Sequence, residues 1–422
     1  KYKLGFTDLV TAWFVKASDF MSQNSRIMSA LVATNSICQG QQVNALWGLL
    51  LEKGIYINFA YTSFPWSNDA SGKAIVTCII VGFSYNKPTN PMLFLTKPND
   101  DKVYSQECTQ ISPYLTDCNE PVIVKSRGSA ISNSLILSYG NMPADGGNLI
   151  FSFHEGQELL SKHPEARPFL KKFIGSSELM KGEFRYCLWL KEEDRDAWSS
   201  IPVIMQHVEA CAKWRSEQKT STDSYKLRTC PWRFREQNTA DKTLVIPVVS
   251  SEKRKYIPID FLDKDTIGCA QVHMLPNAAN YDFGILMSLM HNVWAKFSSG
   301  RLKSDIRYSK ELTFNTFVWP DADQEQHAEI EQLAMNIRMI RVNYDTNMGL
   351  GEMYNPDTMP EDLRQAHEAL DAAVERAYRD EPFQDDEERL AFLLDLYSKA
   401  VAAEEKKVSR KTRSKTKKAA VK

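Results

Sequence analysis

The chain has 422 residues, of which 43% are hydrophobic and 25% charged, and its formal net charge is −1. This size and composition are typical of a protein with two or three globular domains rather than one. No apolar run approaches the length that spans a bilayer, and the N-terminal sequence KYKLGFTDLV lacks the order of a signal peptide, so we expect a cytoplasmic protein without a membrane partner.

The cysteines show no spacing that indicates a disulfide framework or a zinc site. There is no CxxC pair and no paired histidine spacing, so buried, reduced thiols are expected and no metal is implied. The eight positions are Cys38, Cys78, Cys108, Cys118, Cys187, Cys211, Cys230 and Cys269.

The first 90 residues alternate between helical and strand patterns. Apolar spacing predicts helices over 7–21 and 41–54 and strands over 27–33, 55–64 and 74–83. The last two strands are joined by a loop too short for a parallel crossover, so they should pair antiparallel. A parallel sheet that ends in an antiparallel hairpin is typical of Rossmann-like methyltransferases.

Two segments here have the residue types of a ligand site. Residues 34–40 (TNSICQG) form a polar strand-to-helix turn, suited to lining a crevice or serving only as a helix cap. Phe64 and Trp66, in TSFPWSNDASGK, stand at a strand end, where an aromatic ring can stack on a base rotated out of a duplex. The alternative is that both rings pack on the sheet.

From about residue 87 to 310 the pattern becomes mixed α+β. Residues 244–262 predict a hairpin that presents Lys253, Arg254 and Lys255 outward, and residues 281–300 predict one apolar helix. After Pro320, helices are expected over 321–343, 359–380 and 385–405. The basic tail from 405 to 422 should be disordered, either adding phosphate affinity or remaining a solvated end.

The segment GRLKSDIRYS places Arg301, Lys303, Asp305 and Arg307 at every second position. Lys and Arg can donate to guanine O6 and N7, and a carboxylate can accept from cytosine N4. A strand with both charges is therefore able to read both members of a base pair. The alternative is an exposed edge strand whose charges face water.

Seven segments together resemble the C-terminal half of the MmeI-like DNA adenine-N6 methyltransferases, which are often fused to an N-terminal nuclease as single-chain restriction–modification enzymes. The resemblance runs from about Asp8 to about Ala403. The segments are LVATNSICQGQQVNALW, INFAYTSFPWSNDASGKAIVTCIIVGF, GGNLIFSFHEGQELL, FRYCLWL, VIPVVSSEKRKYIPIDFL, FGILMSLMHNVWAKFSSGRLKSDIRYS and FNTFVWP.

The resemblance implies an α/β fold that is part of a class I Rossmann-like methyltransferase, then an α+β target-recognition domain, then a small all-α domain. The expected boundaries are 1–90, 91–319 and 320–404, with the tail at 405–422. The sequence contains neither the family's glycine-bearing S-adenosylmethionine loop nor its Asn-Pro-Pro-Phe motif. We therefore expect the chain to begin inside the methyltransferase domain, and expect no methylation from these 422 residues alone.

The resemblance also implies roles for single residues. Thr34, Asn35 and Ser36 match the sixth methyltransferase motif and would line the active site, and Phe64 in the eighth would stack on the flipped adenine, with Trp66 as a second candidate. The base-reading positions map to Ala270, Gln271, Lys303, Asp305 and Arg307. Arg301, Lys253, Arg254 and Lys255 are expected at DNA phosphates.

The expected partners are double-stranded DNA and the N-terminal part of the methyltransferase, on the same or a separate chain. The expected cofactor, S-adenosylmethionine, would be bound mainly by segments absent from this chain. The alternative is a non-catalytic DNA-binding specificity subunit that relies on another chain for chemistry.

Overall fold

The chain forms two compact units, each built from segments that are distant in sequence. The structure is a computed structural model that describes residues 7–66, 76–96, 102–132, 135–302, 304–344 and 348–419, with side chains up to residue 406. The first unit comprises Lys1–Ser134, Met290–Asp321 and Arg379–Lys422, and the second Leu135–Leu289 and Ala322–Tyr378. No helix of the described part is long and apolar enough to cross a membrane.

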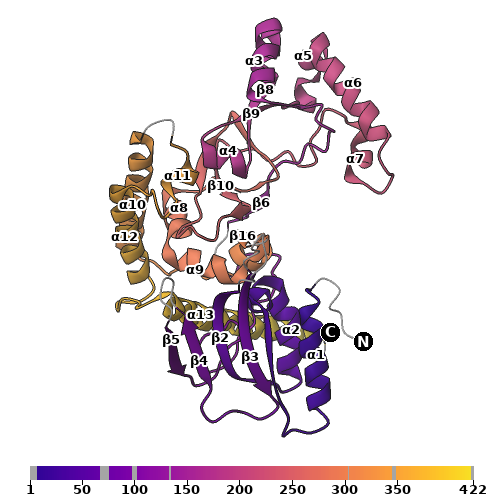
Figure 1. The fold of residues 1–422 in the computed structure, drawn as a ribbon. Coiled ribbons are helices and arrows are strands. Elements are labelled where there is room, and N and C mark those ends of the chain that lie inside the picture. Colours follow the sequence, from indigo (N-terminus) through magenta and orange to yellow (C-terminus); the bar gives the residue numbers. More distant parts are fainter. Residues whose placement is uncertain are drawn as a thin grey trace. The chain divides into compact units, whose positions relative to one another are not determined.

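The first unit contains a mixed five-stranded sheet in the order β1-β3-β2-β4-β5 (Figure 1). Its strands are β1 (Met28–Thr34), β2 (Tyr56–Trp66), β3 (Val76–Ser84), β4 (Met92–Thr96) and β5 (Val103–Glu107). The predicted antiparallel pairing of β2 with β3 is confirmed, and β1 also pairs antiparallel with β3. The sheet continues past residue 90, because β4 pairs parallel with β2.

Two helices, α1 (Val10–Met21) and α2 (Gly40–Glu52), cover one face of this sheet. On that face the Phe14 ring stacks on Phe83 at 5.2 Å and meets the edge of Trp47 at 5.9 Å. All three side chains are fully buried. Because Ile79, Val81 and Phe83 point to this face, the alternate residues of β3, which include Cys78, point to the opposite face.

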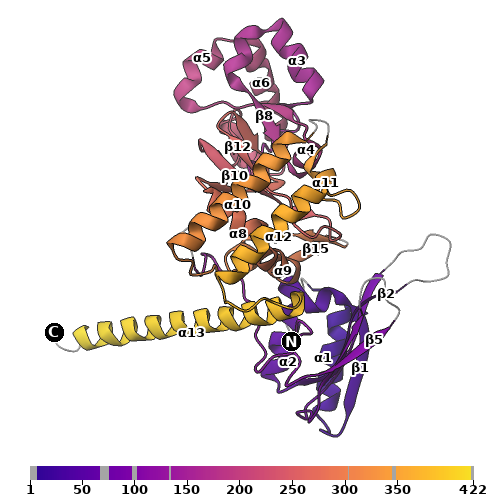
Figure 2. The same ribbon diagram turned by 90° about the vertical axis from the view of Figure 1, so that its left-hand side faces the viewer.

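The remaining helices and strands of the first unit follow the second unit's strands in sequence. It contains α9 (Leu289–Ser298), β15 (Gly300–Leu302), β16 (Asp305–Arg307), the π-helix η5 (Lys310–Phe314) and α13 (Asp386–Ala419). The backbone of α13 remains helical to Ala419 (Figure 2), which differs from the disordered tail that we predicted from residue 405. Lys, Arg and Ala are strong helix formers, so a helix begun upstream can continue through this basic run.

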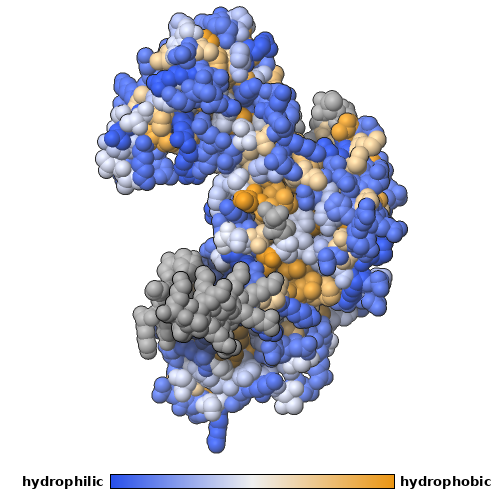
Figure 3. Space-filling model, turned by 180° about the vertical axis from the view of Figure 1, so that it is seen from behind, coloured by the Kyte–Doolittle hydropathy of each residue, from blue (hydrophilic) through white to orange (hydrophobic). Residues whose placement is uncertain are grey.

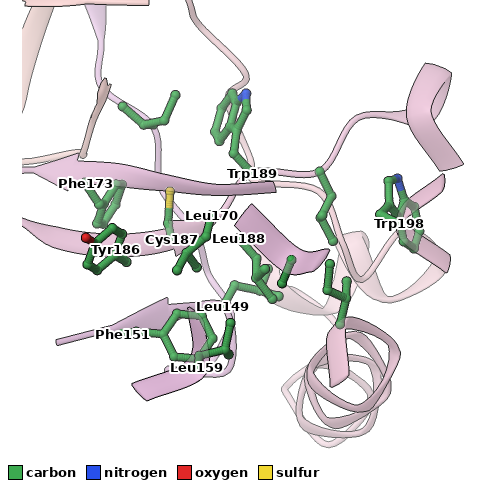
Figure 4. Close-up of a cluster of buried hydrophobic side chains, with 14 of the residues drawn as sticks. Leu149, Phe151, Leu159, Leu170, Phe173, Tyr186, Cys187, Leu188, Trp189 and Trp198 are labelled. Carbon is green, nitrogen blue, oxygen red and sulfur yellow. The ribbon is translucent and has the colours of Figure 1, made fainter. Parts of the chain in front are cut away.

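The second unit contains two four-stranded sheets, ordered β12-β10-β14-β6 and β13-β8-β9-β7. Their strands are β6 (Ser138–Tyr139), β7 (Ile150–Phe151), β8 (Leu170–Ile174), β9 (Arg185–Leu188), β10 (Lys242–Pro247), β12 (Asp260–Asp263), β13 (Thr266–Gly268) and β14 (Val272–Pro276). A further strand of this unit, β11 (Val249–Ser250), belongs to neither sheet. The predicted hairpin of 244–262 is present as the β10–β12 pair. Figure 4 shows one core of this unit, in which Trp189, Leu188 and Phe151 gather beside β8 and β9.

Helices surround these sheets. They are α3 (Phe153–Lys162), α4 (Ser176–Lys181), α5 (Arg195–Ser199), α6 (Pro202–Ser216), α7 (Asp223–Lys226), α8 (Asn280–Met287), α10 (Gln324–Asn343), α11 (Leu350–Met353) and α12 (Glu361–Arg376). Arg215 of α6 is fully buried and donates to five backbone carbonyls, at Pro143, Ala144, Leu227, Cys230 and Arg233. Its guanidinium therefore holds two loops against α6.

The predicted single helix over 281–300 is wrong, because the structure has α8 and α9 with Ser288 extended between them. At this break the backbone N–H of Leu289 donates to the Asp371 carboxylate at 2.8 Å, which satisfies a donor that a continuous helix would have used internally. Asp371 lies on α12, which packs beside α10 (Figure 2). These two helices belong to the second unit, whereas α13 belongs to the first.

Hydrophilic residues predominate on the face seen in Figure 3, with hydrophobic patches between them. Each of the eight cysteines, all of which lie in the described part, is a free thiol, and six of them are buried. The predicted reduced state is confirmed for these residues. Buried thiols of this kind behave as small hydrophobic side chains.

The buried carboxyl of Asp371 should make stability depend on pH. It also accepts a hydrogen bond from the Tyr256 hydroxyl at 2.7 Å, and burial raises its pKa to about 7. Between the ordinary value near 4 and about 7 the folded state keeps a proton that the unfolded state has lost. The unfolding free energy should therefore fall as pH rises through this window, by up to about 1.4 kcal/mol per pH unit.

Urea unfolding of the wild type and of Asp371→Asn at several pH values checks this prediction, because the amide does not titrate. The difference in unfolding free energy between the wild type and Asp371→Asn should shrink from about pH 4 to about pH 7. Asp357→Asn, at an exposed carboxylate of the same unit, is the matched control and should show no such trend. A difference for Asp371→Asn that stays constant with pH would contradict the prediction.

Candidate functional site

Thr34, Cys78 and Phe64 form one row across the first sheet. Thr34 pairs with Cys78, and Cys78 pairs with Phe64 on its other side. Directly paired residues point to the same face, and two strand spacings separate the outer pair by about 10 Å. Since β1 and β2 both end here, the structure brings two predicted site segments to one carboxyl edge, where open α/β sheets bind ligands.

A β-bulge in β2 sets the position of Phe64. The register with β3 shifts between Tyr61 and Phe64, and the extra residue is held by the neighbouring β4. There the Thr62 hydroxyl donates to the carbonyl of Phe94, and the Thr96 hydroxyl donates to the carbonyl of Ser63 at 2.9 Å. Bulges re-aim side chains at the ends of strands.

The two aromatic candidates beyond this bulge differ in exposure. The Phe64 ring is half-buried and has no aromatic partner among the described residues, whereas Trp66 is 55% exposed. Phe64 is therefore partly covered and partly exposed at the end of the strand, whereas Trp66 is mostly exposed.

A hydrogen-bonded cluster holds the turn after β1. The hydroxyls of Thr34 and Ser36 lie 2.8 Å apart, and Ser36 donates to the Asp8 carboxylate at 2.8 Å. Gln42 also donates to Asp8. The side chain of Asn35 makes no hydrogen bond with the described residues, so it is free to contact a ligand. Sequence reasoning missed Asp8 and Gln42, because no local spacing links them to Ser36.

The cysteines near this edge are not prepared for nucleophilic chemistry. Burial raises the pKa of the Cys78 thiol, and it raises that of Cys38 well above its ordinary range. A thiol in such surroundings stays protonated at neutral pH, whereas the thiolate is the nucleophile. The site is therefore suited to binding and positioning rather than to covalent catalysis through sulfur.

The start of α2 lies directly against the chain that leads into β15. Gly40 has φ +58°, and a Cβ there would approach the carbonyl oxygen of Ser299 to 2.9 Å and the Cα of Gly300 to 3.1 Å. Only glycine allows this conformation and this approach together. The preceding residue adds a side-chain contact, because Arg301 Nε donates to Gln39 Oε1 at 2.8 Å.

Residues 300–307 form a hairpin rather than the single strand that we predicted. Arg301 pairs with Ile306, Leu302 with Asp305, and Gly300 with Arg307. Because paired residues share a face and Ile306 is buried, Arg301 points inward, whereas Asp305 and Arg307 point to the other side. The alternating charges therefore do not lie on one face. Lys303 lies outside the described residues.

Buried hydrogen bonds support the base of this hairpin. The Ser299 hydroxyl lies 2.8 Å from that of Thr313, and Trp294 Nε1 donates to Thr316 at 3.1 Å. His291 Nε2 lies 2.8 Å from the Tyr308 hydroxyl. In contrast, the side chains of Asp305 and Arg307 form no hydrogen bond or ion pair with the described residues, so their polar groups remain available to a ligand.

The second unit carries the other polar candidates. Ala270 and Gln271 are the central residues of a turn between β13 and β14, closed by the Val272 N–H donating to the carbonyl of Cys269 at 3.0 Å. Gln271 is exposed at this turn. Lys253 and Lys255 are exposed as well, but Arg254 is half-buried and donates to the carbonyl of Gly351 at 3.3 Å.

The turn after β1 does not have the shape of a nucleotide-cofactor cradle. Such a cradle needs glycines that leave room for the cofactor at a strand-to-helix turn. At the turn after β1 the space beside Gly40 is filled by the backbone of Ser299 and Gly300. Gly40 therefore allows the backbone at 299–300 to pack against the start of α2. It does not leave room for a cofactor, so we assign no cofactor binding to this turn. No group of three or more His, Cys, Asp or Glu residues in the described part could hold a metal ion.

Comparisons with known proteins cover nearly the whole chain. Three family models match: the MmeI DNA-methyltransferase domain over residues 1–95, the MmeI target recognition domain over 118–321 and the MmeI C-terminal domain over 322–403. DNA methyltransferase A of Bacillus subtilis (strain 168) is 43% identical over 393 residues, which are 92% of this chain and 43% of that protein.

One solved structure is also similar throughout. The Type IIL restriction-modification enzyme MmeI in complex with DNA matches with a TM-score of 0.83 and 35% identity, over 94% of this chain and 53% of that chain. The chain therefore spans about half the length of these two relatives.

Two glycines of α2 should respond oppositely to alanine. Gly40→Ala should destabilise the protein by about 1–3 kcal/mol, because the residue has positive φ and its Cβ would press on backbone atoms. Gly48→Ala, the matched control, meets only ordinary contacts at 3.4 Å and should stabilise the helix by about 0.5–1 kcal/mol. Urea unfolding measures both, and a neutral Gly40→Ala variant would refute the close approach.

Proposed function

Because the chain belongs to the MmeI family of DNA methyltransferases, we propose that it supplies the target-recognition part and the base-stacking half of the active site of a site-specific DNA adenine-N6 methyltransferase. One observation carries this proposal. Thr34 and Phe64 stand in one row at the carboxyl edge of the sheet, and the base-reading hairpin is joined to the same edge through Gly40 and Gln39.

The fold of the first unit agrees with such a catalytic half. We propose that its sheet is part of a class I Rossmann-like methyltransferase, because antiparallel β3 lies between two strands, β1 and β2, that run parallel to each other. We also propose that the domains of the chain are divided at residues 90, 319 and 404. The last of them would be a small all-α C-terminal domain. S-adenosylmethionine would be bound mainly by residues other than those described.

In this proposal the chain's own residues hold the target base. An adenine rotated out of the duplex would stack on the free face of Phe64, with Trp66 as a second aromatic surface at the same strand end. Asn35, whose amide is unengaged among the described residues, would line the crevice between Thr34 and Ser36. The apolar face of Phe64 orients the ring, and these polar groups contact its edges.

The hairpin would read the base pair beside the methylated adenine. Lys303 would donate to guanine O6 and N7 on the adenine's strand, and Asp305 would accept from the opposing cytosine N4. The outward orientation and the unpaired carboxylate of Asp305 support this role, as they support base reading by Arg307. Ala270 and Gln271 would read further bases from the turn between β13 and β14.

Phosphate contacts would come from exposed lysines. Lys253 and Lys255 have the exposure that backbone contacts need, and such contacts position a duplex without reading it. Arg254 shares the basic segment but has a backbone carbonyl as a partner, so its contribution to DNA binding would be smaller.

Replacing Phe64 should slow methyl transfer by the enzyme that carries this chain. Phe64→Ala removes the stacking surface, worth about 1–3 kcal/mol per base, so the rate should fall roughly tenfold or more. Phe64→Trp keeps an aromatic face and should retain most of the rate. Transfer of a labelled methyl group to DNA is the measurement. A larger loss in Trp66→Ala than in Phe64→Ala would assign the stacking role to Trp66.

Exchanging the charges of the hairpin should reverse the base preference. In the double variant Lys303→Glu and Asp305→Arg, the acceptor and the donor change places, so cytosine should replace guanine beside the modified adenine, each contact being worth about 1–3 kcal/mol. Sequencing methylated sites in cells that carry each form of the intact gene tests this. Cytosine after the modified adenine in the unaltered enzyme would refute the assignment.

A further inference from the structure

We infer that Arg301 is a positioning residue that clamps the base-reading hairpin to the turn after β1, instead of the phosphate contact that the sequence predicts. The inference rests on the proposed function and adds a determinant of its specificity. Arg301 would touch no base and no phosphate. It would act through the position of the hairpin that carries Lys303, Asp305 and Arg307.

The guanidinium of Arg301 is bound at all three of its nitrogen atoms. Nε donates to Gln39 Oε1 at 2.8 Å, Nη2 to the carbonyl of Lys296 at 2.9 Å, and Nη1 to the carbonyl of Ser304 at 3.4 Å. The three acceptors belong to the turn before α2, to α9 and to the hairpin turn. One planar side chain therefore joins the base of the hairpin, its tip and the sheet edge.

The direction of the side chain agrees with this role. Arg301 lies opposite Ile306 on the inner face of the hairpin, and it is half-buried. A phosphate contact needs guanidinium donors that face outward, as Arg307 could supply from the other face.

The clamp adds restraint where the hairpin has little of its own. β15 and β16 have only three residues each, so few backbone hydrogen bonds between them fix the position of the hairpin tip. Gly40 lets the backbone at 299–300 approach α2, which fixes the base of the hairpin. Without the bonds to Ser304 and Gln39, the hairpin tip can pivot about this base. The base reader would then no longer stand at a fixed distance from Phe64.

Loss of the clamp should therefore reduce the discrimination between base pairs more than the affinity for DNA. Gln39→Leu removes one bond of the clamp and should lower the preference for the correct base pair by about tenfold. Arg301→Gln removes that bond and those to Ser304 and Lys296, so it should lower the preference by at least as much. Their effects should not add in the double variant, because Gln39→Leu removes nothing that Arg301→Gln has not already removed. A phosphate contact predicts a different result, since only Arg301→Gln would then matter.

The experiment uses the full chain and a duplex obtained by selecting the best-bound sequences from randomised DNA. Affinity for this duplex, and for one with the hairpin's base pair exchanged, is measured over a range of salt concentrations. With a clamp, the slope of log affinity against log salt stays at the wild-type value in Arg301→Gln. A slope smaller by about one, with Gln39→Leu unaffected, overturns the inference. Lys255→Gln shows the change expected for a phosphate contact.

A second measurement separates this inference from the proposed function. Amide hydrogen exchange over residues 300–308 of the free chain should accelerate in both Gln39→Leu and Arg301→Gln, and at least as much in Arg301→Gln. Exchange that stays at the wild-type rate in both variants overturns the clamp, whatever the DNA result. If the wild type fails to bind duplex DNA in a salt-dependent way while exchange accelerates, the clamp stands and the proposed function fails.

Discussion

The backbone contact between Gly40 and the Ser299–Gly300 peptide is the constraint on which the site depends. A Cβ at residue 40 would come within 2.9 Å of the Ser299 oxygen, so the two chain segments meet without any side chain between them. The two segments are about 260 residues apart in sequence. The hydrogen bond between Gln39 and Arg301 joins the same two segments. This contact places a hairpin with outward charges that have no partner among the described residues at the edge that carries Thr34 and Phe64.

Much of the first unit was predictable because its signals are local. Helical and strand periodicity located α1, β1, α2, β2 and β3, and the short loop length fixed the antiparallel pairing of the last two. The row of Thr34, Cys78 and Phe64 was not predictable in detail, since it depends on a bulge after Tyr61 that the sequence does not mark. Thr34 and Phe64 themselves were nevertheless predicted as site residues, whereas Cys78 between them was not.

The features that the sequence predicted wrongly or missed have a common physical origin. Alternation with period two continues through a two-residue turn, so the pattern at 301–307 does not reveal that the chain reverses and that Arg301 faces inward. The break between α8 and α9 depends on Asp371, which is 82 residues away from Leu289 in sequence. Likewise, Asp8 and Gln42 bind Ser36 only after folding. Partners that are distant in sequence decide each of these features.

The hairpin separates the residues that maintain its shape from those that face a ligand. Ile306 and Arg301 hold its inner side, whereas Asp305 and Arg307 have no partner among the described residues that a substitution would disrupt. Mutations at the two outer positions therefore leave folding almost unaffected. Under the proposed base-reading role, substitutions at these two positions would change the DNA target without needing a compensating mutation in the core.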